Sequence, residues 1–264
     1  MIKKNKTALI TGPTSGIGLE LAYLFARDNI NLVLASRNKK LLLEIKKDIS
    51  KKFNVIVNIF PVDLSQKGSS RKIYNYCNRK KIKIEYLVNN AGFGKYGLFS
   101  ESSLKLDQEM INLNITSLTE LTKLFVIKMR KRGFGKILNI ASTASFQPGP
   151  YMSVYSATKS YVASFSEAIA EELKNSGVSV TTLCPGPTIS GFQKRAGFKD
   201  DARMYGSFTI VDSKQVAKFG YNKMMNNNRL VIYGLINKMS VFFVKFLPSN
   251  FKTYLVKKVY NYYH

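Results

Sequence analysis

Short apolar runs alternate with longer helical patterns along most of this chain, and this alternation restricts its fold more than any other feature. Seven runs have the length and composition of strands: residues 7–11, 31–35, 55–61, 86–89, 136–140, 178–184 and 230–233. Six segments between them carry helical spacing or helix-forming residues: 17–27, 39–52, 69–79, 106–132, 154–175 and 213–225. Strands that alternate with helices in this way form parallel sheets covered on both faces. The sequence therefore predicts an α/β fold built on a doubly wound parallel sheet.

The length of the chain fits one domain followed by a short extension. A chain of 264 residues with 45% hydrophobic composition can bury one substantial core. No internal repeat and no long Pro/Ser linker divides it. We expect a single domain over residues 1–234 and a C-terminal extension over residues 235–264. Residues 187–209 are irregular and contain several glycines, so we expect a mobile loop there.

The extension is basic and amphipathic. Residues 235–247 and 251–263 mix apolar and aromatic side chains with isolated lysines, and Pro248 separates the two segments. Neither can span a bilayer, because lysines interrupt the first and the second is too short. Residues 213–264 contain nine Lys and Arg but no Asp or Glu. This tail either lies on an anionic membrane or packs on the core or on a partner subunit.

The formal net charge of +25 leaves several partner classes open. A strongly basic surface attracts nucleic acid, anionic lipid or anionic substrates. Lysines spread over solvated faces would give the same net charge. No nucleic-acid recognition motif accompanies the charge, so we expect no nucleic-acid partner.

The two cysteines and the single histidine argue against several kinds of chemistry. Cys77 and Cys184 are far apart and form no CxxC pair, which disfavours a disulfide scaffold and a zinc site. His264 lies at the terminus without a neighbouring nucleophile or carboxylate, which disfavours histidine metal sites and Ser-His-Asp hydrolysis. We expect no metal and a reducing, cytoplasmic location. The apolar residues 8–10 behind the basic start are too few for an export signal.

The first predicted strand ends in a glycine-rich turn that leads into a helix. Gly12 permits a tight turn, Gly16 lets the backbone approach a phosphate, and Gly18 permits close helix packing. The helix N-terminus adds free N–H groups and a partial positive charge, which suit a dinucleotide pyrophosphate. A strand-to-helix turn without a ligand is the alternative. The expected cofactor contacts in this turn are Gly12, Thr14, Ser15, Gly16, Ile17 and Gly18.

The ends of the second and third strands indicate which dinucleotide binds. Folds that prefer NAD place an acid after the second strand, where this chain has Ala35, Ser36 and Arg37. Arg37 can pair with a 2′-phosphate and Ser36 can donate to it, which favours NADP(H); a solvated loop charge is the alternative for Arg37. Asp63, followed by Leu64, is suited to accept from the adenine amino group, although Asp-Leu-Ser is also typical of a helix N-cap.

Small and polar residues close the fourth predicted strand, in the order Asn89, Asn90, Ala91 and Gly92. Small side chains let a cofactor lie against the strand ends, and two asparagines in an apolar context need partners. They bind cofactor and join neighbouring strands, or they make a turn, and both interpretations can hold. We expect Asn90, Ala91 and Gly92 to contact the cofactor.

Tyr155 and Lys159 are the candidates for proton transfer. They lie four residues apart on a predicted helix and therefore project from the same face. An unperturbed tyrosine, with a pKa of about 10, is a poor base at neutral pH. A nearby ammonium can lower that pKa by roughly 1–3 units. Ser142, directly after the fifth strand, would hydrogen-bond the substrate oxygen and stabilise charge there during hydride transfer. A surface helix pair is the alternative for Tyr155 and Lys159.

Together these motifs resemble the short-chain dehydrogenase/reductase family, over residues 7 to about 188 and in the expected order. The residues that carry the resemblance are Thr11, Gly12, Gly16, Ile17, Gly18, Asp63, Asn89, Asn90, Ala91, Gly92, Asn114, Ser142, Tyr155, Lys159, Pro185 and Gly186. The resemblance implies a single-domain Rossmann fold and a catalytic tetrad completed by Asn114, which positions a water for proton relay. Lys159 would hold the nicotinamide ribose beside Tyr155. Pro185, Gly186 and Thr188 are similar to the family's nicotinamide-carboxamide contact, and the loop that follows to its variable substrate lid.

The resemblance also implies an activity and an assembly. It implies an NADPH-dependent oxidoreductase that interconverts a carbonyl and an alcohol on a small or lipophilic substrate, with Tyr155 as acid/base. A non-catalytic NADP(H)-binding sensor or scaffold is the alternative. Residues 106–132 and 154–175 would form the helical surface of a homodimer or homotetramer. Pro13 departs from the family pattern, because it stiffens the turn and removes an N–H. The basic tail resembles reductases of lipophilic substrates at membrane surfaces, so peripheral contact with an anionic membrane is a second interpretation of its location.

Overall fold

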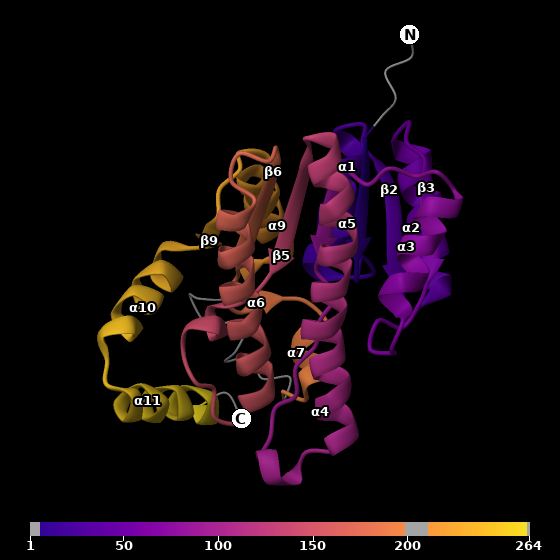
Figure 1. Ribbon diagram of the computed structural model, residues 1–264. Coiled ribbons are helices and arrows are strands. Elements are labelled where there is room, and N and C mark those ends of the chain that lie inside the picture. The colour runs from indigo at the N-terminus through magenta and orange to yellow at the C-terminus, as the bar shows by residue number, and fades with distance from the viewer. Residues whose placement is uncertain (1–5, 199–210, 263–264) are drawn as a thin grey trace.

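The computed structural model describes residues 6–198 and 211–262. Its centre is a sheet of seven strands in the order β3-β2-β1-β4-β5-β6-β9 (Figure 1). These strands are β1 (Thr7–Thr11), β2 (Asn31–Ser36), β3 (Val57–Pro61), β4 (Tyr86–Asn89), β5 (Gly135–Ile140), β6 (Val178–Cys184) and β9 (Leu230–Ile232). Each neighbouring pair is parallel. The predicted parallel α/β fold is confirmed.

The strands are apolar throughout because helices cover both faces of the sheet. Alternate residues of β1 enter opposite cores: Ala8 and Ile10 pack in one, and Leu9 in the other. Leu9 lies beside Val33 of β2, and both are fully buried in the second core. Burying one such side chain stabilises the fold by about 1.5–3 kcal/mol relative to exposure.

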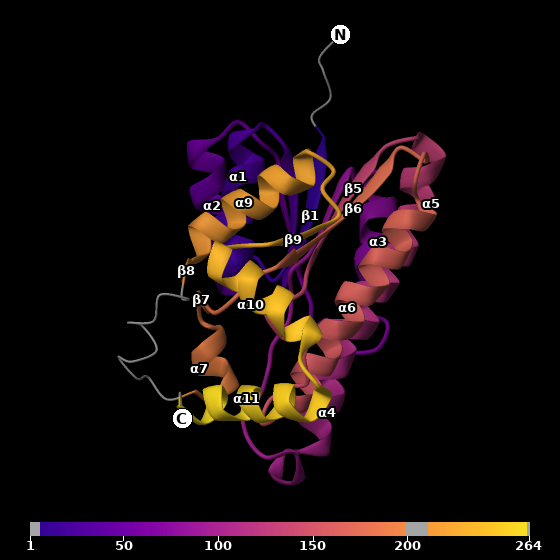
Figure 2. The same cartoon turned by 90° about the vertical axis from the view of Figure 1, so that its left-hand side faces the viewer.

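Six helices form the two outer layers of the domain (Figures 1 and 2). The first core receives side chains from α1 (Gly16–Arg27), α2 (Lys39–Lys52) and α9 (Ser213–Met225). The second core is covered by α3 (Ser69–Arg79), α5 (Leu118–Arg132) and α6 (Ser153–Glu172). The sequence of α2 shows how this is encoded, because Leu42, Ile45 and Ile49 recur at helical spacing and all three are buried.

The order of the strands reverses next to β1. The chain runs from β1 through β2 to β3 at one edge, and β4 then returns to the other side of β1. The carboxyl ends of β1 and β4 therefore border the reversal point. Open parallel sheets bind their ligands at such a point.

Three predicted elements differ in detail from the structure. The helix predicted over residues 106–132 begins as α4 (Leu104–Ile111) and passes through a π-helix, η2 (Asn112–Ser117), before it becomes α5. The third strand begins at residue 57 instead of 55. The loop predicted over residues 187–209 includes short elements: β7 (Thr188–Ile189), which pairs with β8 (Val211–Asp212), and α7 (Phe192–Ala196). Residues 199–210 of that prediction lie outside the described residues. Elements of two to five residues carry no readable period. The described residues also form two short 3-10 helices, η1 (Phe99–Glu101) and η3 (Thr143–Phe146).

The C-terminal extension forms two helices, as predicted. α10 (Leu235–Phe246) and α11 (Ser249–Tyr262) meet at Pro248 and lie along one side of the molecule, which faces the viewer in Figure 2. A narrow inner side of these helices is buried, at Asn237, Val241 and Val256. Among the described helices, none combines the length and the apolarity that crossing a bilayer requires.

Candidate active site

The glycine-rich turn between β1 and α1 adopts a conformation that requires its glycines. Gly12 and Gly16 have φ angles of 64° and 57°, in the left-handed region. A Cβ on Gly18 would lie 2.3 Å from Nδ2 of Asn90 and 2.4 Å from the Gly12 carbonyl oxygen. No side chain caps the N-terminus of α1, at Ser15, and its first turn contains no acid. The first N–H groups of this helix are thus available to an anion.

Asn90 and Thr11 hold this turn against the end of β4. Nδ2 of Asn90 donates to the carbonyl oxygens of Thr11 and Gly12, at 3.0 and 2.9 Å. Oγ1 of Thr11 accepts from the backbone N–H groups of Asn90 and Ala91, both at 3.0 Å. Asn89 joins other elements, since its Nδ2 donates to Thr122 on α5 and to Asn139 on β5. Both asparagines therefore connect neighbouring strands and helices, one of the two roles expected of them.

A second arginine, Arg195 of α7, lies near the predicted Arg37 at the end of β2. Ser36 is half-buried and Arg37 is exposed. Burial lowers the pKa of Arg195 on α7, and the nearby positive charge of Arg37 lowers it further. Nε of Arg195 donates to the carbonyl oxygen of Gly191, which fixes the start of its side chain. Sequence reasoning missed Arg195, because it reaches Arg37 only through the packing of α7 beside the glycine turn.

Asp63 organises its own turn in this structure. Its Oδ1 accepts from the N–H and the hydroxyl of Ser65, at 2.9 and 2.8 Å. Leu64 between them is buried in the second core. Asp63 does not cap a helix, because α3 begins six residues later with Gly68 as its N-cap; adenine recognition stays a prediction.

Four side chains from three parts of the fold converge beside Gly92. Tyr155 and Lys159 lie one turn apart on α6, and Nζ of Lys159 is 5.8 Å from the centre of the Tyr155 ring. Ser142 follows β5 and lies close enough to the Tyr155 hydroxyl to influence its pKa. A Cβ added to Gly92 would lie 3.1 Å from Oδ1 of Asn114 and 3.4 Å from Nζ of Lys159. The structure therefore brings the four predicted tetrad residues together.

Asn114 is placed by the π-helix η2. Its Nδ2 donates to the Phe93 carbonyl oxygen and to Oγ1 of Thr158, both at 3.0 Å, and its Oδ1 accepts from the Phe93 N–H. Thr158 precedes Lys159, so Asn114 is tied to α6 next to Lys159. π-Helical turns inside α-helices are frequent at functional sites. The sequence pattern predicted one continuous helix over residues 106–132 and gave no indication of the π-helix.

The pKa of Tyr155 corrects one expectation. Burial raises this pKa above its ordinary value, the hydrogen bond with Ser142 opposes that rise, and the neighbouring Tyr260 adds to it. Lys159 is not among the groups that shift this pKa, and its Nζ donates to the Ile140 carbonyl oxygen at 2.7 Å. Burial also lowers the pKa of Lys159 to about 8. Helical spacing predicted the proximity of the two residues but not the effect of their burial.

The segment after β6 connects the site to the tail. The carbonyl oxygen of Pro185 accepts from the Thr143 N–H, and Oγ1 of Thr188 donates to the Gly186 carbonyl oxygen at 2.9 Å. A Cβ on Gly186 would lie 2.5 Å from Nδ2 of Asn237 on α10. The predicted carboxamide contact is thus the place where α10 rests on the domain. Asn237 is a further position that sequence reasoning missed.

Aromatic side chains from distant segments surround Tyr155. Phe192 of α7 packs on its ring with centroids 5.2 Å apart, and Tyr260 of α11 lies close enough to influence its pKa. Tyr96 contacts Tyr260, and it stacks on Tyr151 at 5.5 Å between centroids. The sequence shows these aromatics only as scattered residues, since no local pattern joins them.

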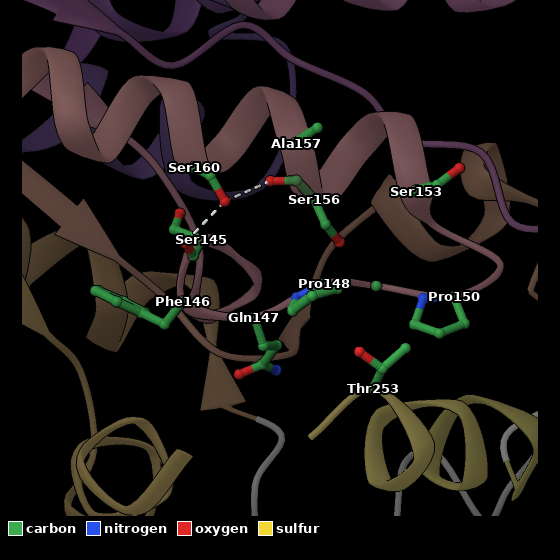
Figure 3. A pocket seen from close by; sticks show the side chains of 11 residues that line it. Ser145, Phe146, Gln147, Pro148, Pro150, Ser153, Ser156, Ala157, Ser160 and Thr253 are labelled. Atoms are coloured by element: carbon green, nitrogen blue, oxygen red, sulfur yellow. Dashed lines mark hydrogen bonds between the residues drawn. The ribbon is translucent and has the colours of Figure 1, made fainter. Parts of the chain in front are cut away.

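A pocket of roughly 500 Å³ lies beside this site, between α6, the segment after η3 and α11 (Figure 3). Ser153, Ser156 and Ser160 line it from α6, and Thr253 lines it from α11. None of the four tetrad residues lines it. The pocket therefore lies between the domain and the C-terminal extension.

Comparisons with known proteins agree with this geometry. Residues 6–200 match the family model described as short chain dehydrogenase. The chain belongs to the short-chain dehydrogenase/reductase family. As a short-chain dehydrogenase/reductase, it is 36% identical over 182 residues to the very-long-chain 3-oxoacyl-CoA reductase of Rattus norvegicus, which covers 67% of this chain and 58% of that protein. It is 32% identical over 181 residues to the ketoacyl reductase HetN of a Nostoc species, over 69% of this chain and 63% of that one.

The chain thus spans less than two thirds of the length of these curated relatives. A solved structure of a short-chain dehydrogenase from Sphingobium yanoikuyae in complex with NADPH is similar over nearly the whole chain. It has a TM-score of 0.81 and 27% identity, and the match covers 92% of this short-chain dehydrogenase/reductase and 96% of that protein. The described residues contain no group of three His, Cys, Asp or Glu side chains that could hold a metal.

Proposed function

We propose that this short-chain dehydrogenase/reductase is an NADP(H)-dependent enzyme that interconverts a carbonyl and an alcohol, with Tyr155 as the acid/base. One observation carries the proposal: Ser142 lies close enough to the Tyr155 hydroxyl to lower its pKa, and Lys159 projects from the next turn of the same helix. A surface helix pair would be solvated, whereas Lys159 is 6% exposed. Burying an ammonium is costly, which favours a functional reason for its position.

The turn after β1 fits a dinucleotide. Gly18 leaves no room for a side chain, and the uncapped start of α1 offers N–H groups to a pyrophosphate. The residues that would hold the cofactor are those predicted from the sequence, with Arg195 added. When bound, the nicotinamide supplies or accepts the hydride.

Arg37, Ser36 and Arg195 support a preference for NADP(H). Two guanidinium groups close enough to repel each other would both gain from a phosphate between them. The NADPH complex of the Sphingobium yanoikuyae structure agrees with this preference.

The raised pKa of Tyr155 suits the reductive direction. The hydroxyl stays protonated at neutral pH, so it can donate its proton to the substrate oxygen while Ser142 hydrogen-bonds that oxygen. Lys159, with a pKa of about 8, remains mostly charged at pH 7, and its Nζ lies 5.8 Å from the centre of the Tyr155 ring. Asn114, fixed to Phe93 and Thr158, would position a water that returns the proton.

The aromatic residues around Tyr155 favour a lipophilic substrate. Phe192 packs on the ring of Tyr155, Tyr260 lies close enough to influence its pKa, and Tyr96 contacts Tyr260. The two curated relatives are named for 3-oxoacyl-CoA and ketoacyl reduction. We therefore place 3-oxoacyl thioesters and bulky ketones first among substrate classes.

For the assembly, we propose a cytoplasmic homodimer or homotetramer formed by the outer sides of α5 and α6. Ile127 of α5 is 47% exposed and Tyr161 of α6 is 37% exposed. Tyr161 also stacks on Phe165, which builds a flat apolar surface on α6. Sedimentation of an Ile127→Lys variant as a monomer would support this interface, and an unchanged assembly would contradict it.

The function is tested by following NADPH oxidation over a panel of aldehydes, ketones, steroids and 3-oxoacyl thioesters, with the stereochemistry of the products determined. We expect substrate-dependent oxidation with at least one lipophilic class. Tight NADPH binding with no turnover across the panel would instead support the non-catalytic sensor or scaffold.

A further inference from the structure

We infer that α10 and α11 form a docking surface for an anionic lipid bilayer, with their outer apolar side chains inserted among the headgroups. We call this surface the tail face. It consists of the outward apolar residues Leu235, Ile236, Met239, Phe242, Phe243, Phe246, Phe251, Tyr254, Leu255 and Val259, together with the lysines of both helices.

The exposure of these side chains is the first observation. Leu235 and Phe246 are each 73% exposed, and Phe242 is 58% exposed. Leu235, Met239, Phe242 and Phe246 recur at i, i+4, i+7 and i+11, so they form one stripe along α10. Scattered exposed hydrophobics are ordinary, but a contiguous stripe of large ones marks an interaction site.

The inner side of α10 is already occupied. Asn237 and Val241, four residues apart, are buried against the domain, and Nδ2 of Asn237 donates to the Tyr233 carbonyl oxygen. The outer stripe lies on the opposite side of the helix from these two residues. In the described chain, one side of α10 is therefore buried against the domain, and the larger apolar side remains exposed.

The charge of the tail face selects its partner. α10 and α11 contain five lysines and no Asp or Glu. Lys238 and Lys245 are seven residues apart and run beside the apolar stripe on α10. A second copy of this chain would bring lysines against lysines, which opposes association through this face. An anionic bilayer fits both the charge and the apolar surface of the tail face. Its headgroups attract the lysines, and the aromatic rings insert at the boundary of the acyl chains.

The helix α2 shows that this arrangement is not a general property of basic helices in the chain. α2 has six lysines, but its apolar stripe is buried, and Asp48 pairs with Lys52 at 2.8 Å. Of α2, α10 and α11, only the two tail helices combine exposed apolar side chains with lysines and no acidic residue. α2 therefore supplies the matched control.

Docking would place the bilayer next to the active site. The inner side of α11 carries Tyr260, which influences the pKa of Tyr155, while the outer side of the same helix carries Phe251 and Tyr254. A lipophilic substrate that partitions into the membrane would therefore meet the enzyme where α11 borders the catalytic residues.

The test is co-sedimentation of the full chain with phosphatidylcholine vesicles that contain or lack phosphatidylserine. We expect binding to the anionic vesicles only, and its loss at high salt. Replacing Phe242, Phe243 and Phe246 by Ser should weaken binding at least tenfold. Replacing Lys238, Lys257 and Lys258 by Gln should weaken it on the order of 100-fold, about fivefold for each lysine near the surface.

Two variants of matched chemistry serve as controls. Leu43→Ser with Ile56→Ser removes exposed apolar side chains elsewhere, and replacing Lys46, Lys47 and Lys51 by Gln removes three exposed charges of α2. Both should bind vesicles like the parent protein, and all variants should keep NADPH affinity. Equal binding to both vesicle types, equal losses in the α2 variants, or a tail-dependent dimer without vesicle binding would each overturn the inference.

Discussion

The two sides of the active site are built in different ways. On the side of the glycine turn, most of the geometry comes from one short segment, Gly12 to Gly18, which Asn90 at the end of β4 holds in place. On the substrate side, rings from distant segments meet, as Phe192 and Tyr260 do around Tyr155. The comparison teaches that the conformation of the glycine turn follows from local spacing, whereas the surroundings of Tyr155 depend on how distant segments pack.

The largest effect that would sharpen this comparison is on cofactor choice. Replacing both Arg37 and Arg195 by Ala should weaken NADPH binding roughly 100-fold or more and leave NADH binding nearly unchanged. Each charge-assisted contact to a phosphate contributes about 1.5–3 kcal/mol. Fluorescence titration of the parent and variant proteins with NADPH and with NADH measures these affinities. If Arg37→Ala alone weakens NADPH binding as much as the double replacement does, Arg195 does not contribute to NADPH binding.

The next effect concerns the turn itself. Gly18→Ala should weaken binding of both cofactors roughly 10- to 100-fold, because its Cβ would meet Asn90 and the Gly12 carbonyl at less than 2.5 Å and overpacking costs about 1–3 kcal/mol. Gly191→Ala is the control, since its Cβ would find only Ser15 Oγ at 4.0 Å. Equal affinity of the two variants for NADPH would break the account of the turn.

Lys159 lies where the two sides meet, and its burial predicts a pH-dependent stability. Its pKa is about 8 in the folded chain and 10.5 when exposed, so between these values the unfolded state binds more protons and stability rises with pH. Lys159→Met should therefore raise the free energy of unfolding at pH 7 by on the order of 1–3 kcal/mol, and this gain should shrink above pH 8 and vanish above a pH of 10.5, the ordinary pKa of lysine.

Urea unfolding at both pH values measures this effect, with turnover expected to fall. A variant that is less stable at pH 7 would mean that the hydrogen bond from Lys159 to the Ile140 carbonyl outweighs the cost of burial.

The smallest effect is on the substrate side. Tyr260→Ala should raise KM for a lipophilic substrate by about tenfold or less, since one aromatic contact contributes about 0.5–1.5 kcal/mol, and it should leave NADPH affinity unchanged. Tyr254→Ala is the control, because this residue of the same helix is 60% exposed on its outer side. Steady-state kinetics measures KM for both variants. Equal KM values would show that Tyr260 does not contact the substrate.

The same division explains what could be predicted from the sequence. The parallel sheet, the glycine turn and the spacing of Tyr155 and Lys159 follow from local patterns, and the structure brings the predicted tetrad residues together. Arg195 and Tyr260 gave no signal, because only the packing of α7 and α11 brings them to the site. The pKa of Tyr155 was predicted with the wrong direction, since burial depends on the whole fold.

The central claim is that Tyr155 donates the proton, and single-turnover NADPH oxidation by Tyr155→Phe tests it most directly. The account predicts a loss of about 10²- to 10⁴-fold in the rate of reduction, with NADPH affinity unchanged. A Tyr155→Phe enzyme that reduces the same substrate at the parent rate would contradict it.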